Sequence, residues 1–251
     1  MTRPIKVDFD APPLSEVVCG VLFKVLERFE ISDYGLLWEE FAEEFPTTAD
    51  QATLLRTDRL NENPGPRVWF LSEDETHLLQ VQRDRFLFNW RKVRGEGTYP
   101  RFDAVYAAFT RHRGTFERFV AETGSPQLES LQLSYVNVVP MAGELSYGDY
   151  SAILKGLTWP SDGVSFDPQG FNWLLEGRAP HGSDNDKLTV LAQSGLRKED
   201  DLPVLRLELT VRGPAPGRDL DEWFKGAHDS IVETFVDVTT EDAQQRWGRR
   251  R

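Results

Sequence analysis

Hydrophobic and polar positions in the first half of the chain follow both strand and helix patterns. Residues 16–26 form an almost continuous apolar run, which is typical of a buried strand. The segments 67–71, 77–82 and 86–93 are separated by turn-forming residues and predict an antiparallel meander. Between the strand and the meander, apolar residues recur at helical spacing as far as Pro46, which predicts an amphipathic helix. The apolar positions of this helix are Leu36, Leu37, Trp38, Phe41 and Phe45.

A longer amphipathic helix is predicted after Pro100. Its apolar stripe runs from Phe102 to Val120, and Gly124 with Pro126 ends the pattern. The second half of the chain shows a similar order of patterns. It is predicted to hold a long strand over 128–141, a short helix over 147–157, strands over 166–177, 187–196 and 204–212, and a long helix over 219–239.

The two halves are similar enough to indicate an internal duplication. Val93-Arg94-Gly95 recurs 118 residues later as Val211-Arg212-Gly213, at the same place in the order of elements. We therefore expect an α+β fold of two tandem units, 1–125 and 126–251, the second with a basic C-terminal tail. Each unit is expected to be a curved antiparallel sheet with a long helix packed on one face.

Composition limits the class of protein. The 251 residues include 39% hydrophobic residues, and 29 Lys and Arg stand against 41 Asp and Glu, which gives a net charge of −12. This charge argues against bulk attraction to nucleic acid or to anionic lipid. The chain has one cysteine and no apolar stretch long enough for a membrane helix. We expect a cytoplasmic protein that does not bind a membrane.

The charge is unevenly distributed within the first half. Acidic residues dominate 27–50, whereas 83–118 holds nine Lys and Arg and four Asp and Glu. Two interpretations remain open. The two segments are ordinary solvated faces, or they are complementary patches that dock on a partner or on a second copy of the chain.

No residue pattern indicates catalysis. Cys19 lies in an apolar strand and is expected to be a buried, unreactive thiol. His77, His112 and His181 are expected to face solvent, whereas His228, beside the apolar stripe of the last helix, is expected to have a structural, hydrogen-bonding role. Glycine-rich phosphate loops and a nucleophilic serine elbow are missing from the sequence. We expect no catalytic residue, no cofactor and no metal site, and therefore no enzyme.

The most distinctive segment is Trp90-Arg91-Lys92-Val93-Arg94, followed by Tyr99-Pro100-Arg101. Cations beside aromatic rings can bind phosphate or stack on bases. Arg101 lies where the helix dipole favours an anion, so a bound anion would relieve both charges. The alternative is a corner that forms salt bridges with the acidic helix over 33–44. The candidate partner- or anion-binding residues are Trp90, Arg91, Lys92, Arg94, Tyr99 and Arg101.

Several short motifs together carry a resemblance to a known family. They are Leu37-Trp38-x2-Phe41, Trp90-Arg91-Lys92, Tyr99-Pro100-Arg101-Phe102, Tyr135-x-Asn137, Ala227-His228-x2-Ile231-x3-Phe235-x3-Thr239 and Trp247-Gly248. From near Glu16 to Gly248, the chain resembles a sporadically distributed family of uncharacterised bacterial proteins of about this length. The resemblance implies a bacterial, cytoplasmic protein with no assigned activity or catalytic residues. The family's patchy distribution is similar to that of phage-defence and toxin–antitoxin genes.

These observations favour a non-enzymatic interaction protein in a bacterial complex, acting as an adaptor, a sensor or an antitoxin-like inhibitor. One alternative is a ligand-binding module with an apolar pocket between helix and sheet. Another is binding of nucleic acid or another anion through the basic patch 83–118. The aromatic residues that could line an apolar pocket, most of them expected to be plain core, are Trp69, Phe86, Phe88, Trp90, Tyr135 and Trp173.

Overall fold

The computed structural model describes most of the chain. The described residues are 7–56, 64–93, 97–121, 124–141, 150–157, 165, 170–197 and 200–250. Of the residues singled out above, Arg94 lies outside these ranges, as do 147–149 of the predicted short helix and 166–169 of the predicted strand.

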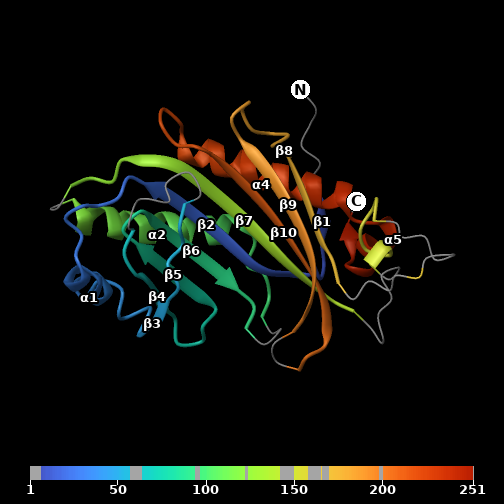
Figure 1. Cartoon of the computed structure of the whole chain (residues 1–251), viewed down its shortest axis with the longest axis horizontal. Coiled ribbons are helices and arrows are strands. Elements are labelled where there is room, and N and C mark those ends of the chain that lie inside the picture. Colours follow the sequence, from blue (N-terminus) through green and yellow to red (C-terminus); the bar gives the residue numbers. More distant parts are fainter. Residues whose placement is uncertain are drawn as a thin grey trace. The chain divides into compact units, whose positions relative to one another are not determined.

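The described residues form an α+β fold with a large antiparallel sheet and four helices (Figure 1). The strand order of the sheet is β3-β4-β5-β6-β2-β7-β10-β9-β8. Its strands are β2 (Leu14–Phe23), β3 (Thr47–Gln51), β4 (Arg67–Leu71), β5 (His77–Gln82), β6 (Arg85–Arg91), β7 (Leu128–Pro140), β8 (Asn172–Arg178), β9 (Lys187–Leu196) and β10 (Pro203–Pro214). The helices are α1 (Ile31–Glu39), α2 (Phe102–Val120), α4 (Leu220–Val238) and α5 (Glu241–Arg246), and β1 (Asp8–Phe9) pairs with β11 (Arg249–Arg250) in a second sheet.

The chain divides into two compact units, and one of them is inserted in the sequence of the other. The inserted unit consists of Glu16–Leu133 and Arg212–Arg218. The outer unit consists of Met1–Ser15, Ser134–Val211 and Asp219–Arg251. These boundaries differ from the predicted division into 1–125 and 126–251, which rests on an internal repeat in the sequence.

The inserted unit is built on the meander that the sequence predicts. β5 and β6 form a hairpin in which Leu79 faces Phe88 and Val81 faces Phe86. Helix α2 packs on this sheet through stacked rings, because Phe116 lies 4.9 Å from Phe86 between ring centroids. The predicted helix after Pro100 is confirmed over Phe102–Val120.

The outer unit is held together by α4 and by a buried polar contact. Asp219 caps α4, because its side chain accepts a hydrogen bond from the backbone N–H of Glu222 at 2.9 Å. Asp186 is 1% exposed and accepts a hydrogen bond from the indole N–H of Trp223 at 3.0 Å. The Asp186 carboxylate therefore provides the hydrogen-bond acceptor that the N–H of a buried indole ring requires.

Two expectations about individual side chains are wrong. His112, expected to face solvent, is 3% exposed, because it occupies a position on the apolar stripe of α2 between Phe109 and Phe116. Leu36, expected on the buried stripe of the first helix, is 53% exposed. Helix α1 begins at Ile31 and buries Tyr34 together with Leu37, which the sequence placed on this stripe.

Candidate functional site

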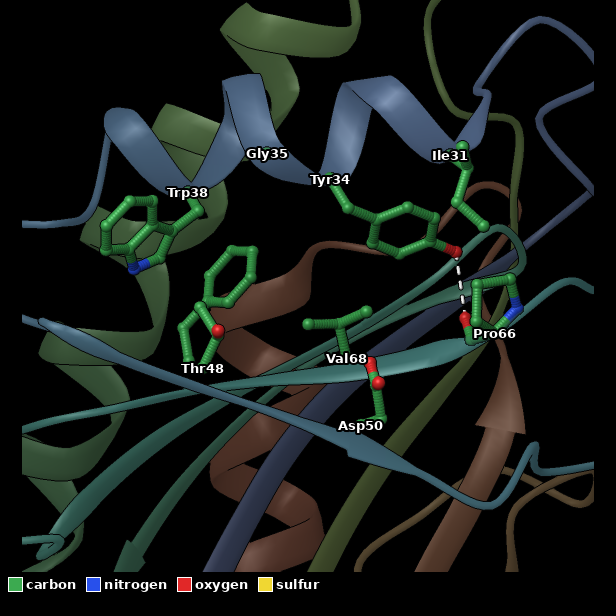
Figure 2. A pocket seen from close by; sticks show the side chains of 9 residues that line it. Ile31, Tyr34, Gly35, Trp38, Thr48, Asp50, Pro66 and Val68 are labelled. Atoms are coloured by element: carbon green, nitrogen blue, oxygen red, sulfur yellow. Dashed lines mark hydrogen bonds between the residues drawn. The ribbon is translucent and has the colours of Figure 1, made fainter.

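An open groove lies in the inserted unit between α1 and strands β3 and β4, with a cavity volume of about 450 Å³. Figure 2 shows the side chains of Tyr34 and Trp38 pointing from α1 toward the strands. The groove is lined by Ile31, Tyr34, Gly35, Trp38, Thr48, Asp50, Pro66, Val68 and Phe70. A concave surface with aromatic walls and few polar groups is typical of a binding site.

The aromatic walls of the groove are fixed by hydrogen bonds to the backbone. The Tyr34 hydroxyl donates to the carbonyl of Pro66 at 2.8 Å. The Trp38 indole N–H donates to the carbonyl of Phe45 at 2.9 Å. Both rings keep their orientation without an occupant, so the groove is preorganised.

Strand β3 forms one side of the groove and pairs with β4 alone among the described strands. The register places Thr48 opposite Phe70 and Asp50 opposite Val68. These four residues all line the groove, because alternate residues of a strand share a face. The groove is therefore open along the free edge of a sheet.

Gly35 leaves part of the groove empty. It lies in the middle of α1, where glycine costs about 1 kcal/mol relative to alanine. A Cβ atom added at this position would meet nothing within 4 Å. No close approach within the described chain therefore requires a glycine at this position.

The surroundings of the groove are acidic. Asp50 lines the groove, and Glu39 and Glu40 lie at the C-terminal end of α1. All three side chains are exposed, and none forms an ion pair within the ranges that the structure describes. Uncompensated carboxylates beside an apolar groove favour a cationic ligand.

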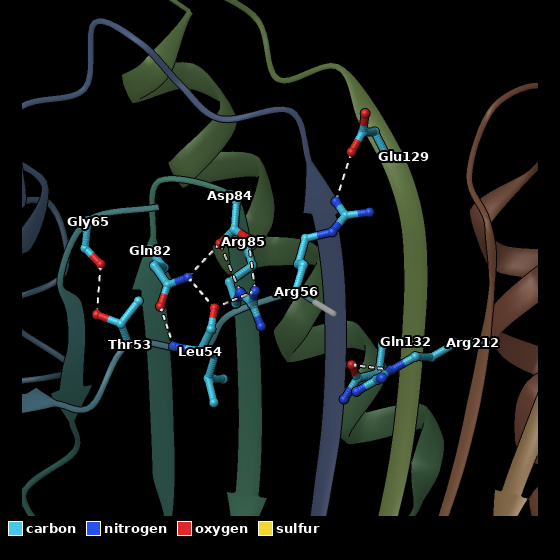
Figure 3. Close-up of polar contacts among 10 residues, drawn as sticks. All are labelled: Thr53, Leu54, Arg56, Gly65, Gln82, Asp84, Arg85, Glu129, Gln132 and Arg212. Atoms are coloured by element: carbon cyan, nitrogen blue, oxygen red, sulfur yellow. Dashed lines mark hydrogen bonds and ion pairs between the residues drawn. The ribbon is translucent and has the colours of Figure 1, made fainter. Parts of the chain in front are cut away.

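A buried polar network holds the chain that follows β3 (Figure 3). Arg85 donates to both carboxylate oxygens of Asp84, at 2.9 and 2.8 Å, and to the carbonyl of Leu54 at 2.9 Å. Gln82 accepts from the N–H of Leu54 and donates to its carbonyl, at 2.9 and 3.0 Å. Because Gln82, Asp84 and Arg85 are all at most 8% exposed, the network fixes the backbone just beyond β3.

Two aromatic residues of the predicted corner, Trp90 and Tyr99, contact each other. Trp90 is 4% exposed, and its ring centroid lies 5.1 Å from that of Tyr99. Arg91 donates to the carbonyl of Glu75 at 2.7 Å and lies over the ring of Trp69. Lys92 is half-buried after β6.

Arg101 occupies an unusual backbone conformation at the start of α2. Its φ is 77° and its ψ is 157°, a region that residues other than glycine rarely adopt. Its carbonyl accepts from the N–H of Val105 at 3.3 Å, so the strained residue also begins the helix. No sequence pattern predicts this backbone strain at Arg101.

Several basic residues of the patch 83–118 already have partners. Arg111 forms a two-point ion pair with Glu44. Arg83 donates to the carbonyls of Leu26 and Glu27, at 3.1 and 2.9 Å. Arg111 lies outside the corner Trp90–Arg101, so this ion pair leaves the predicted salt bridges between the corner and the helix over 33–44 untested. Within the corner, Arg91 lies 3.5 Å from a carboxylate oxygen of Glu75, which is not in that segment.

A second, smaller cavity of about 100 Å³ lies beside His112 in the inserted unit. The ring of Phe88 is stacked between two histidines, 5.6 Å from His77 and 5.4 Å from His112. Burial lowers the pKa of His112 to about 4, and the nearby Arg111 guanidinium adds to this effect. Burial also lowers the pKa of His77.

His228 lies on α4 in the outer unit. Its Nδ1 lies 2.8 Å from the hydroxyl of Tyr135, within hydrogen-bond distance. This contact agrees with the predicted hydrogen-bonding role. His181 is also held, because its Nε2 lies 2.5 Å from a carboxylate oxygen of Glu233.

Of the six aromatic residues considered for a pocket between a long helix and the sheet, Trp69 and Trp173 are half-buried. Phe86, Phe88, Trp90 and Tyr135 are each at most 6% exposed, which confirms that they belong to the core. The groove at α1 instead uses residues that sequence reasoning passed over, namely Ile31, Gly35 and Asp50. One signal was present, because Ile31, Gly35 and Trp38 follow the i, i+4, i+7 spacing of a helix face.

Searches of the described residues add two findings. They contain no cluster of histidine, cysteine and carboxylate side chains that could hold a metal ion. No helix among them is both long enough and apolar enough to cross a membrane.

Comparison with known proteins gives no assignment. The sequence matches no protein-family model, and it matches no curated protein.

Proposed function

We propose that this chain is a non-enzymatic interaction component of a bacterial complex, and that it binds a segment of a partner protein in the groove between α1 and β3. The observation that carries the proposal is the combination of an open apolar groove with the exposed carboxylate of Asp50, which forms no ion pair with the described residues. An adaptor, sensor or inhibitor in a defence or toxin–antitoxin system would use such a surface. Burial of Cys19 supports a role other than thiol chemistry, because it raises the pKa of the thiol.

The groove indicates the chemistry of the partner segment. Ile31 is 77% exposed and Val68 is half-buried, so a large apolar side chain would cover surface that is now in contact with water. A lysine or arginine next to that side chain would lie near Asp50. We therefore expect the bound segment to combine one apolar anchor with at least one cation.

Selection of peptides from a random display library on the immobilised protein tests this proposal. We expect the enriched peptides to carry a large apolar residue together with lysine or arginine. Their affinity should fall as ionic strength rises, because part of the attraction is between charges. Enrichment of acidic peptides would contradict the proposed charge complementarity.

Two variants connect any binding to the groove. Gly35→Leu places a side chain in the empty space and should abolish binding, whereas Asp50→Lys should weaken it by roughly tenfold. Gly114→Leu is the matched control, since Gly114 is also a helical glycine and its added Cβ would meet only the end of the Arg118 side chain, at 3.7 Å. Equal binding by the Gly35 variant would refute the proposal.

A small amphipathic amine is the other class of ligand that would suit this groove. A thermal-shift screen with such amines separates the two, because a ligand that binds the folded state raises the melting temperature. Stabilisation by amines, together with failure to enrich any peptide, would show a ligand-binding module instead.

We also infer that the chain arose by duplication into tandem units of 1–125 and 126–251. Support comes from the two long helices, which are both 19 residues long and are related by the same shift of 118 residues as the repeated motif. The first residues of β6 and β10, Arg85 and Pro203, differ by the same shift. An experimental structure in which the two halves fail to superpose along this alignment would refute the duplication.

A further inference from the structure

Strand β8 in the outer unit is an exposed edge of the sheet. It lies at one end of the strand order and pairs with β9 alone among the described strands. Six of its seven residues are exposed, including Leu174 at 57% and Leu175 at 44%. Natural proteins usually protect such edges with proline, lysine, a bulge or a very short strand. The sequence of β8, Asn-Trp-Leu-Leu-Glu-Gly-Arg, contains neither proline nor lysine.

The hydrogen bonds to β9 show which backbone groups of β8 remain available. Ala179 donates its N–H to the carbonyl of Asp186 at 2.9 Å, and the carbonyl of Phe171 accepts from Ser194 at 3.2 Å. Backbone groups alternate between the two sides of a strand, so the odd-numbered residues face β9. The residues that direct their N–H and C=O groups toward the free edge are therefore Asn172, Leu174, Glu176 and Arg178.

We propose that β8 pairs antiparallel with β8 of a second copy of this chain, with the two-fold axis at Leu175. A two-fold axis perpendicular to the sheet must pass between a residue and its own copy. With the axis at Leu175, Asn172 faces Arg178 of the second copy and Leu174 faces its Glu176. In this arrangement, every residue of β8 that directs its N–H and C=O groups toward the free edge pairs with a residue of β8 in the second copy.

The side chains of β8 fit this register. Trp173 would face Gly177 of the second copy, and the two Leu175 side chains would meet on the axis. These three positions share a sheet face with Val190 and Ala192 of β9, which are both at most 2% exposed. A large ring beside a glycine avoids a steric conflict and covers exposed backbone.

Neighbouring registers are less favourable. An axis at Glu176 would place two carboxylates directly opposite each other, which is destabilising. An axis at Leu174 would leave Gly177 and Arg178 without partners inside the strand. The axis at Leu175 therefore gives the most favourable register of the three. The resulting interface is isologous, because both copies contribute the same surface.

Sedimentation measured over a range of protein concentrations tests the dimer. We expect a reversible dimer of micromolar affinity, because a single strand pair buries less surface than an obligate interface. Leu175→Lys should raise the dissociation constant by roughly 100-fold, since it removes an apolar contact and places two ammonium groups on the axis. Leu202→Lys is the matched control, because Leu202 is 48% exposed in the loop between β9 and β10.

A cysteine placed on the axis gives an independent measurement of the register. Cys19 is fully buried, so an introduced thiol is the only accessible one. Leu175→Cys should form an intermolecular disulfide under mild oxidation, because opposite residues in a non-hydrogen-bonded pair lie close together. Leu202→Cys and Leu174→Cys should cross-link much more slowly.

Three results would overturn the proposal. They are a chain that stays monomeric at every concentration, a dimer that Leu175→Lys leaves intact, and preferential cross-linking through position 174 or 202. Circular dichroism of each variant establishes that the strand still folds. If Leu175→Lys unfolds the outer unit, the cross-linking experiment on the folded cysteine variants decides the question.

Discussion

The buried histidine of α2 provides the sharpest test of the energetics of the inserted unit. His112 is packed among aromatic rings, with Phe45 at 5.1 Å and Phe88 at 5.4 Å between centroids. Its Nε2 lies 3.1 Å from an Arg111 nitrogen, which can only donate a hydrogen bond. The neutral ring is therefore favoured in the folded state, in agreement with a pKa lowered to about 4.

This pKa makes stability depend on pH in a definite direction. An unfolded histidine has a pKa of about 6.5, so at lower pH the unfolded state binds a proton that the folded state excludes until about pH 4. Stability is therefore unaffected by this group above about pH 6.5 and falls as the pH is lowered from there. The loss is about 2 kcal/mol at about pH 5 and about 3 kcal/mol at about pH 4.

Urea unfolding of the parent and of His112→Phe at several pH values measures this contribution. Other groups also titrate as the pH falls. One is Glu44, and the hydrogen bond from Arg111 lowers the pKa of its carboxyl group. The relevant quantity is therefore the difference between the two proteins in how their free energy of unfolding changes with pH. We expect the parent to lose about 2 kcal/mol more than the variant between about pH 7.5 and pH 5. Direct titration of the His112 ring by NMR is the accompanying measurement.

The reasoning would be refuted if the ring titrates near the usual histidine value. It would equally be refuted if the parent and the variant lose stability in parallel as the pH falls. Either result would mean that water or a rearrangement of Arg111 stabilises the imidazolium ion inside the folded inserted unit.

Four further predictions concern single positions. Arg101→Gly should be more stable than Arg101→Ala by about 1–2 kcal/mol in thermal unfolding, the reverse of the usual order, because glycine tolerates the backbone angles observed there. Gly35→Ala should raise stability by about 0.5–1 kcal/mol, measured in urea, since its methyl group meets nothing. Asp186→Ala should lower the stability of the outer unit by about 1–3 kcal/mol, seen by hydrogen exchange, because the Trp223 N–H loses its acceptor. Cys19 should react with a thiol reagent only at the rate of unfolding; rapid reaction in the native state would contradict its burial.

Regular elements of the fold were accessible from the sequence because their signals are local. The strand predicted over 187–196 coincides with β9, and the helix predicted over 219–239 agrees with α4 to within one residue at each end. Apolar periodicity together with a capping Asp219 is sufficient to define such a helix. His112 could have been recognised by the same argument, since it lies three residues after Phe109 and four before Phe116 on the stripe.

The groove could not be predicted in the same way. It joins α1 to β3, and the sequence of β3, Thr-Thr-Ala-Asp-Gln, indicates only a weak strand within 47–66 and gives no sign that this strand lies beside α1. Gly35 lines the groove beside unoccupied space. Whether space is left beside a residue depends on how the elements pack, which the sequence does not show. Likewise, the positive φ of Arg101 follows no local rule, because such strain is imposed by the surrounding structure.

The insertion of one unit within the other sets an order of events during synthesis. The inserted unit is nearly complete once Leu133 has emerged from the ribosome, and it lacks only Arg212–Arg218. Phe9, in contrast, packs against Phe235 and Trp247, which are made more than two hundred residues later. Strand β1 must therefore wait, unpaired, until Phe235, Trp247 and strand β11 have been made. We expect nascent chains stalled before Phe235 to hold a protease-resistant inserted unit and a protease-sensitive segment around β1.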